Sequence, residues 1–270
     1  MTHIYDALMD NFAALAVEAV HYPVIAAQSY WLVLMAQQDS SVSSLTLGTL
    51  LRQSRETTTL PLPPWAQPLA SQALGRLLCD GIWLETSASL TLPQVCSCID
   101  LESSSHAVIC WRTVYEPYVD EIRDHVCRLW QAACHLYGPY TPDLAVLPEE
   151  VRRGVILFET GFYFACHEYF ETLWGRTEDA ASDLYQGMIQ IAVAMRHLES
   201  HNVRGAILLL RYGMGRLQRY PAVYKGLDLA AWLERLETLL EQLETLSDPK
   251  AYQFDPRHVP HLPNLKMCGG

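Results

Sequence analysis

The most informative run of this sequence reads Cys166-His167-Glu168-Tyr169-Phe170-Glu171-Thr172-Leu173-Trp174. It places a histidine and a carboxylate four residues apart in an apolar stretch, and positions four apart share one face of an α-helix. In helical projection this face holds Thr160, Tyr163, Phe164, His167, Phe170, Glu171 and Trp174. Because most of these residues are aromatic, we expect the face to point into the core. A buried His or Glu costs several kcal/mol without a partner, so the pattern predicts a polar network or a binding site.

The next predicted helix, roughly Glu178–Glu199, carries a second polar line. Its members project within about 60° of one another and are Asp183, Gln186, Gln190 and His197. Gly187 and Ala194 flank them, and small residues allow a neighbouring helix to come close enough for hydrogen bonds across the contact. We therefore expect this line to meet His167 and Glu171.

Several of these segments together resemble a bacterial and archaeal family catalogued as domain of unknown function 309. The family signature is a His, a Glu four residues on and a Trp three further. The matching segments are Gly161-Phe162-Tyr163-Phe164-Ala165-Cys166-His167-Glu168, then Glu171 and Trp174, then Tyr185-Gln186-Gly187-Met188-Ile189-Gln190-Ile191-Ala192, then Gly205-Ala206 and Gly226-Leu227-Asp228. The resemblance covers roughly residues 148–240 and departs from the family at Phe164 and Gly175. It implies a compact helical bundle and no particular activity, because the family is uncharacterised.

Two kinds of site fit the polar residues. In the first, His167 and Glu171 hydrogen-bond to Gln186 and Gln190 and fix how the helices pack, as a structural cluster or a small-ligand site in a binding or interaction protein. In the second, a metal-dependent, hydrolase-like enzyme, His167 and Glu171 bind a divalent metal. Glu168, Asp183 or His197 would then add a ligand or base, and Trp174 would form a pocket wall. We favour the first because amide side chains are poor ligands for most transition metals and no second His pair is present. The sequence does not decide whether the protein is an enzyme.

The spacing of apolar residues predicts a mainly α protein with two domains. Residues 1–140 form an α-rich N-terminal domain in which Gly81–Glu85 and Ser89–Leu92 alternate like a β-hairpin, the order of a winged-helix-like fold. Residues 147–247 form the helical bundle, and residues 248–270 form an extended Pro-rich tail. The leucines of the last helix have heptad-like spacing, which would permit a homo-oligomer, but packing within the bundle is favoured.

Charge and composition limit the classes of molecule that we expect this protein to bind. The net charge is −11, and residues 1–111 hold three Arg and no Lys against nine acidic residues. This acidic balance argues against nucleic acid as a binding partner, and therefore against a transcriptional regulator that acts through the N-terminal wing. Eight cysteines without a cleavable apolar leader fit a cytoplasmic protein, and no apolar run is long enough to span a membrane. An unidentified protein or small molecule is the expected partner.

Overall fold

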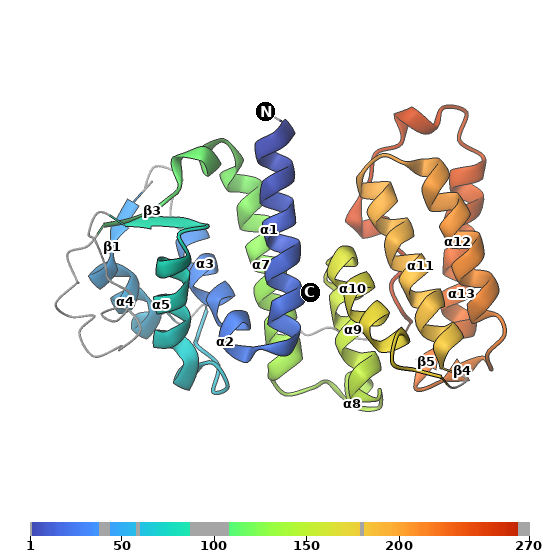
Figure 1. The fold of residues 1–270 in the computed structure, drawn as a ribbon, viewed down its shortest axis with the longest axis horizontal. Helices are drawn as coiled ribbons and strands as arrows, with labels where there is room; N and C mark the ends of the chain where they lie inside the picture. The colour runs from blue at the N-terminus through green and yellow to red at the C-terminus, as the bar shows by residue number, and fades with distance from the viewer. Residues whose placement is uncertain (1, 38–43, 58–59, 87–107, 179–180, 264–270) are drawn as a thin grey trace. The chain divides into compact units, whose positions relative to one another are not determined.

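The structure is a computed structural model that describes residues 2–37, 44–57, 60–86, 108–178 and 181–263. The chain divides into two compact units, Met1–Gly138 and Pro139–Gly270. Most of the described residues are helical (Figure 1), which confirms the predicted mainly α class.

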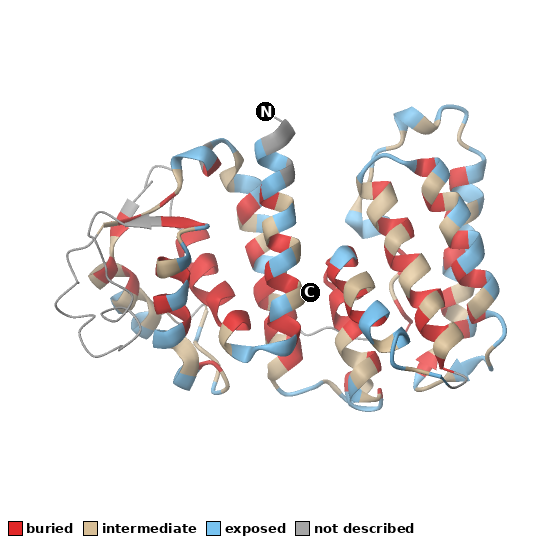
Figure 2. Cartoon of the chain, viewed as in Figure 1, coloured by how far each residue is buried: buried red, intermediate tan, exposed pale blue. Residues whose placement is uncertain are grey.

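The first unit is built around a helix that is buried on every side. Its helices are α1 (Thr2–His21), α2 (Pro23–Ala26), α3 (Gln28–Ala36), α4 (Leu47–Glu56), α5 (Ala70–Asp80) and α7 (Val119–Tyr137), with short 3-10 turns at Gln67–Leu69 and Thr113–Tyr118. All nine residues of α3 are buried, as the colours of Figure 2 show. Helix α3 is therefore at the core of this unit.

Three short strands complete the first unit. They are β1 (Ser44–Thr46), β2 (Leu84–Thr86) and β3 (Val108–Trp111), and they pair antiparallel in the order β1-β3-β2. With α4 and α5 between β1 and β2, this is the element order of a winged helix-turn-helix. Strand β2, which overlaps the first strand of the predicted hairpin, Gly81–Glu85, pairs with β3, with Leu84 opposite Trp111. The segment 89–92 lies outside the described residues.

The second unit is a helical bundle that contains the candidate site. Its helices are α8 (Pro142–Ala145), α9 (Glu149–Glu159), α10 (Tyr163–Trp174), α11 (Ser182–Glu199), α12 (Val203–Leu217) and α13 (Leu229–Glu244). The heptad-like leucines of α13, among them Leu236 and Leu243, are buried within this unit. Packing within the bundle is thus the arrangement observed.

The second unit is not wholly helical, contrary to expectation. Strands β4 (Val223–Tyr224) and β5 (Leu227–Asp228) pair across a two-residue turn. Both turn residues have positive φ, 49° at Lys225 and 79° at Gly226, which is the backbone of a tight hairpin turn. The side chain of Asp228 then accepts a hydrogen bond from the Ala231 N–H at 3.1 Å and caps α13.

The Pro-rich segment after α13 packs onto the bundle as far as the structure describes it. It contains 3-10 turns at Pro249–Ala251 and Pro256–His258. Val259 and Leu262 are only 6% and 3% exposed. The indole N–H of Trp232 donates to the Pro260 carbonyl at 2.7 Å, so this segment is an integral part of the second unit through residue 263.

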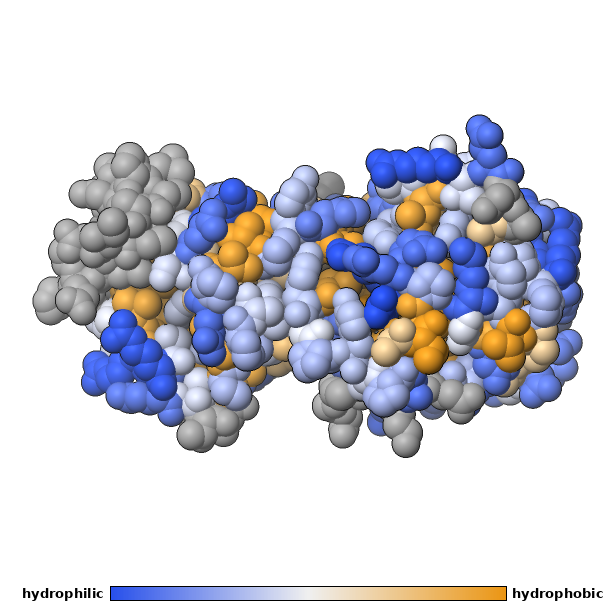
Figure 3. Space-filling model, turned by 90° about the horizontal axis from the view of Figure 1, so that it is seen from below, coloured by the Kyte–Doolittle hydropathy of each residue, from blue (hydrophilic) through white to orange (hydrophobic). Residues whose placement is uncertain are grey.

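Apolar side chains lie mainly in the interior of the two units. On the face of the molecule drawn in Figure 3, hydrophobic residues form separate patches among hydrophilic ones. Within the described segments, no helix combines the length and apolarity that crossing a bilayer requires.

Two glycines set the distance between α11 and α12. A Cβ added at Gly213 would lie 3.0 Å from the Gly187 carbonyl oxygen, and one at Gly187 would lie 3.3 Å from the Gly213 oxygen. Backbone atoms cannot move aside as a flexible side chain can. The two helices are therefore in backbone contact, which only glycine permits at these positions.

We expect Gly213→Ala to lower the free energy of unfolding by about 1–3 kcal/mol, because the added methyl group would force α11 and α12 apart. Gly215, two residues further along the same helix, has nothing within 4 Å of an added Cβ. Gly215→Ala should therefore stabilise by about 0.5–1 kcal/mol through helix propensity. Urea unfolding of both variants checks this, and equal effects would refute the backbone contact.

Candidate functional site

Helix α10 follows α9 after a tight turn that fixes its direction. Gly161 has a φ of 79°, a conformation that favours glycine. The hydroxyl of Thr160 donates to the Ile156 carbonyl at 2.7 Å, and the N–H of Phe162 donates to the Leu157 carbonyl at 2.8 Å. These bonds satisfy the end of α9, so α10 begins at once and packs beside it.

One face of α10 is firmly packed in the core. Its buried residues are Tyr163, Ala165, Cys166, Tyr169 and Phe170. Phe170 stacks on Tyr185 of α11 with ring centroids 5.8 Å apart. Burial raises the pKa of the Cys166 thiol and raises that of the Tyr169 hydroxyl to about 12. Neither group is therefore suited to proton transfer near neutral pH.

The other face of α10 carries a line of residues that we call the α10 stripe: Phe164, His167, Glu168, Glu171 and Trp174. Phe164 is 44% and Trp174 37% exposed, and the side chain of Glu171 is 54% exposed. The prediction that one aromatic face points into the core is only partly correct: Thr160, Tyr163 and Phe170 are buried, whereas Phe164, Glu171 and Trp174 are exposed. The core face is centred near Cys166, about 100° around the helix from His167.

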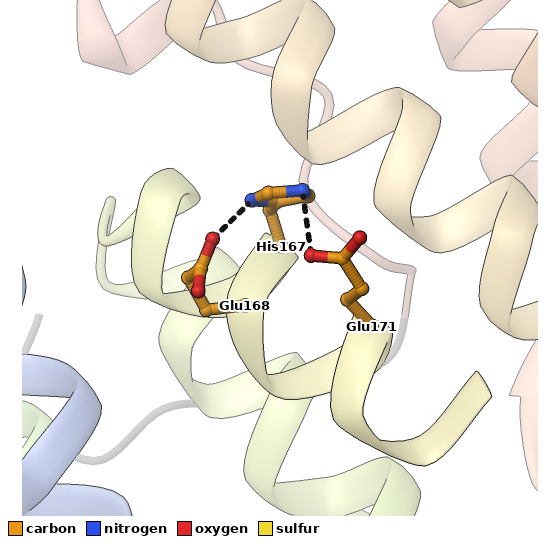
Figure 4. A group of neighbouring side chains, drawn as sticks. All are labelled: His167, Glu168 and Glu171. Carbon is orange, nitrogen blue, oxygen red and sulfur yellow. Dashed lines mark ion pairs between the residues drawn. The ribbon is translucent and has the colours of Figure 1, made fainter. Parts of the chain in front are cut away.

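The His167 ring lies between two carboxylates (Figure 4). Its Nδ1 is 3.2 Å from the Glu168 Oε1, and its Nε2 is 3.5 Å from the Glu171 Oε2. The Phe164 ring lies beside it, with centroids 5.9 Å apart. The side chain of His167 is 22% exposed, so the arrangement is a half-buried imidazole held by neighbours from its own helix.

The same three residues are the candidate ligands for a cation. One ligand atom each from His167, Glu168 and Glu171 can be chosen so that all lie within 4.8 Å of one another. Imidazole nitrogen and carboxylate oxygen suit Zn²⁺ and other divalent metals. All three come from one helix, and among the described residues no further His, Cys, Asp or Glu joins this group.

The structure places the polar residues of α11 in other contacts. Asp183 forms ion pairs with Arg216 and Arg219 of the α12 end, the second at 3.0 Å. His197 Nδ1 lies 3.1 Å from the Asn202 Nδ2 at the turn into α12. Within the described part of the chain, no hydrogen bond joins His167 or Glu171 to α11. Gln186 and Gln190 are half-buried. The Gln190 Oε1 is a buried atom without a hydrogen-bond partner. The eight predicted site residues are thus divided among separate contacts.

Sequence reasoning missed a buried carboxylate that holds the C-terminal segment. Glu159, whose side chain is 4% exposed, lies 2.8 Å from the His261 Nδ1 and accepts the Leu262 N–H at 2.8 Å. The hydrogen bond to Glu159 raises the pKa of His261. The signal in the sequence was a single Glu ending the apolar run 155–158, together with apolar residues spaced among the prolines.

A known protein family matches the segment that contains α10. Residues 151–209 match a family described as "Domain of unknown function (DUF309)". The bundle resembles DUF309. The match includes the α10 stripe and all of α11 and confirms the predicted resemblance.

One relative is similar over a longer stretch of the chain. Over 92 residues the chain is 37% identical to the uncharacterised protein YpuF of Bacillus subtilis strain 168. The aligned stretch covers 33% of this chain and 53% of YpuF. The chain thus spans about half the length of this relative. No solved structure matches the chain. The resemblance to DUF309 names no reaction.

We expect His167→Ala to change the free energy of unfolding by less than about 1 kcal/mol, because its ion pairs are partly exposed and lie within one helix. Phe170→Ala, three residues on, should cost about 3–5 kcal/mol, because Phe170 is fully buried. Chemical denaturation of the two variants tests which face of α10 is packed. A loss above about 2 kcal/mol for His167→Ala would contradict the outward placement.

Proposed function

We propose that this chain is a binding protein that recognises a protein partner through the α10 stripe. One observation carries the proposal: two large aromatic side chains, Phe164 and Trp174, are exposed on the same helix face as the His167 and Glu171 pair. Exposed aromatic residues next to charged ones are typical of contact surfaces.

The length of the stripe suits contact with a single helix or loop of a partner protein. From Phe164 to Trp174 it spans eleven residues, or about 15 Å along the helix axis. The opposite face of α10 is fixed by Tyr169 and Phe170 in the core. A rigid surface loses little conformational freedom on binding, which favours affinity.

The aromatic residues should contribute most of the binding energy. Truncation of a Trp or another large aromatic that becomes buried in an interface often costs 2 kcal/mol or more. His167, Glu168 and Glu171 would add hydrogen bonds and select for a partner of matching charge. The stripe therefore combines apolar anchors with a polar centre.

A second candidate function uses the same residues. The close approach of ligand atoms from His167, Glu168 and Glu171 would suit a divalent cation that a partner completes. A hydrolase finds less support, because Asp183 and His197 lie in other contacts. Metal content of untagged protein, compared with that of His167→Ala, distinguishes this candidate from the first.

DNA binding through the first unit finds little support as well. Helix α5, which stands where a winged helix would read DNA, carries Arg76 as its single basic residue. The acidic balance of residues 1–111 opposes approach to phosphate.

The proposal is tested by partner capture from the cells that make this protein. We expect the Phe164→Ala, Trp174→Ala double variant to recover its specific partner at least tenfold less than the wild type, since losing about 2 kcal/mol lowers affinity roughly thirtyfold. The matched control is Leu208→Ala, Tyr212→Ala, which removes two side chains of α12 that are 52% and 57% exposed.

Both double variants remove exposed side chains, so their stabilities should stay close to that of the wild type. The control should retain the partner. If the same proteins are recovered with all three forms, or if the control loses them equally, the α10 stripe is not the contact surface.

A further inference from the structure

A cleft in the second unit lies between α13 and the C-terminal segment. It has a volume of about 540 Å³, within the range of small-molecule sites. Its lining residues are Arg235, Thr238, Leu239, Gln242, Arg257, His258, Val259, Pro260 and His261. All lie outside the residues 151–209 that match DUF309.

Both walls of the cleft are fixed. The Trp232 indole donates to the Pro260 carbonyl at 2.7 Å, and the Arg235 Nη1 donates to the His261 carbonyl at 3.0 Å. Glu159 holds the far side of the segment through His261 and Leu262. The cleft is therefore formed before any ligand arrives.

The cleft is lined by basic side chains, although the chain as a whole is acidic. The chain carries a net charge of −11, yet the cleft is lined by two Arg and two His and by no Asp or Glu. Cations gathered in a concave site focus a positive potential there and attract anions.

Two of these four basic side chains are already paired with a carboxylate. Arg257 donates through Nε and Nη2 to Asp255, and the His261 ring is paired with Glu159. Arg235 differs, because within the described residues no carboxylate lies at ion-pair distance and its hydrogen bond goes to a carbonyl. His258 is 4.0 Å from Asp255 and 74% exposed. Arg235 is thus the principal unpaired positive charge in the cleft.

We propose that this cleft binds a small organic anion, with a carboxylate or phosphate group on Arg235 and the apolar part on Leu239, Val259 and Pro260. A guanidinium can hold either group through paired hydrogen bonds. Thr238 and Gln242 add neutral polar groups at the same wall. This site is separate from the α10 stripe, and neither proposal depends on the other.

The test uses phenyl phosphate and benzoate as probes for the full chain, each measured by isothermal titration calorimetry at fixed ionic strength. The key variants are Thr238→Glu and Thr238→Gln, which differ in charge and hardly in shape. Thr238 is exposed, and its hydroxyl bonds to the Glu234 carbonyl of its own helix. Both variants should fold as the wild type does.

We expect saturable binding of at least one probe to the wild type and to Thr238→Gln, and at least tenfold weaker binding to Thr238→Glu, because the added carboxylate would repel the anion at close range. Arg235→Gln should also weaken probe binding at least tenfold. The control variant Arg204→Gln lies on α12, outside the cleft, and should change probe binding less than twofold. The probe that binds more tightly identifies the preferred group.

Two results would overturn the proposal. One is the absence of saturable binding of either probe to the wild type. The other is equal binding to Thr238→Glu and Thr238→Gln, which would place the anion elsewhere on the surface.

Discussion

The backbone contact between α11 and α12 at Gly187 and Gly213 is the constraint on which the second unit depends. Helix α10 packs against α11, and α13 packs against α12, so the spacing of the central pair sets the position of both outer helices. The ion pairs of Asp183 with Arg216 and Arg219 join the same two helices at one end. The α10 stripe and the cleft beside α13 therefore lie on the two outer helices, α10 and α13, which pack on either side of the α11–α12 pair.

The position of α10 explains why its polar residues are available at the surface. Phe170 fills the space above Gly154 and beside Tyr185, which fixes the rotation of the helix about its own axis. That rotation leaves Phe164, His167 and Trp174 outside the core. Ion pairs within one helix turn hold the imidazole in place at little cost in stability. The residues that resemble a site are therefore free to contact a partner, because packing does not require them.

Much of the fold could be predicted from the sequence, because helix periodicity and helix-breaking residues are local signals. The helices of the bundle and the resemblance to DUF309 are examples. The orientation of α10 could not be read reliably, because aromatic residues lie on both of its faces; the small residues Ala165 and Cys166 mark the true core side. Contacts between distant residues were also missed. The partner of Glu159 lies 102 residues away, and no local pattern encodes such a pairing.

Site-specific photo-cross-linking in living cells determines whether the α10 stripe is a contact surface. A photo-reactive phenylalanine analogue would replace Phe164 in one form and Tyr212 of α12 in another, since both positions are exposed aromatics of the same unit. We expect a defined protein to be cross-linked from position 164 and not from position 212. Identical products from both positions, or no product from position 164, would contradict it.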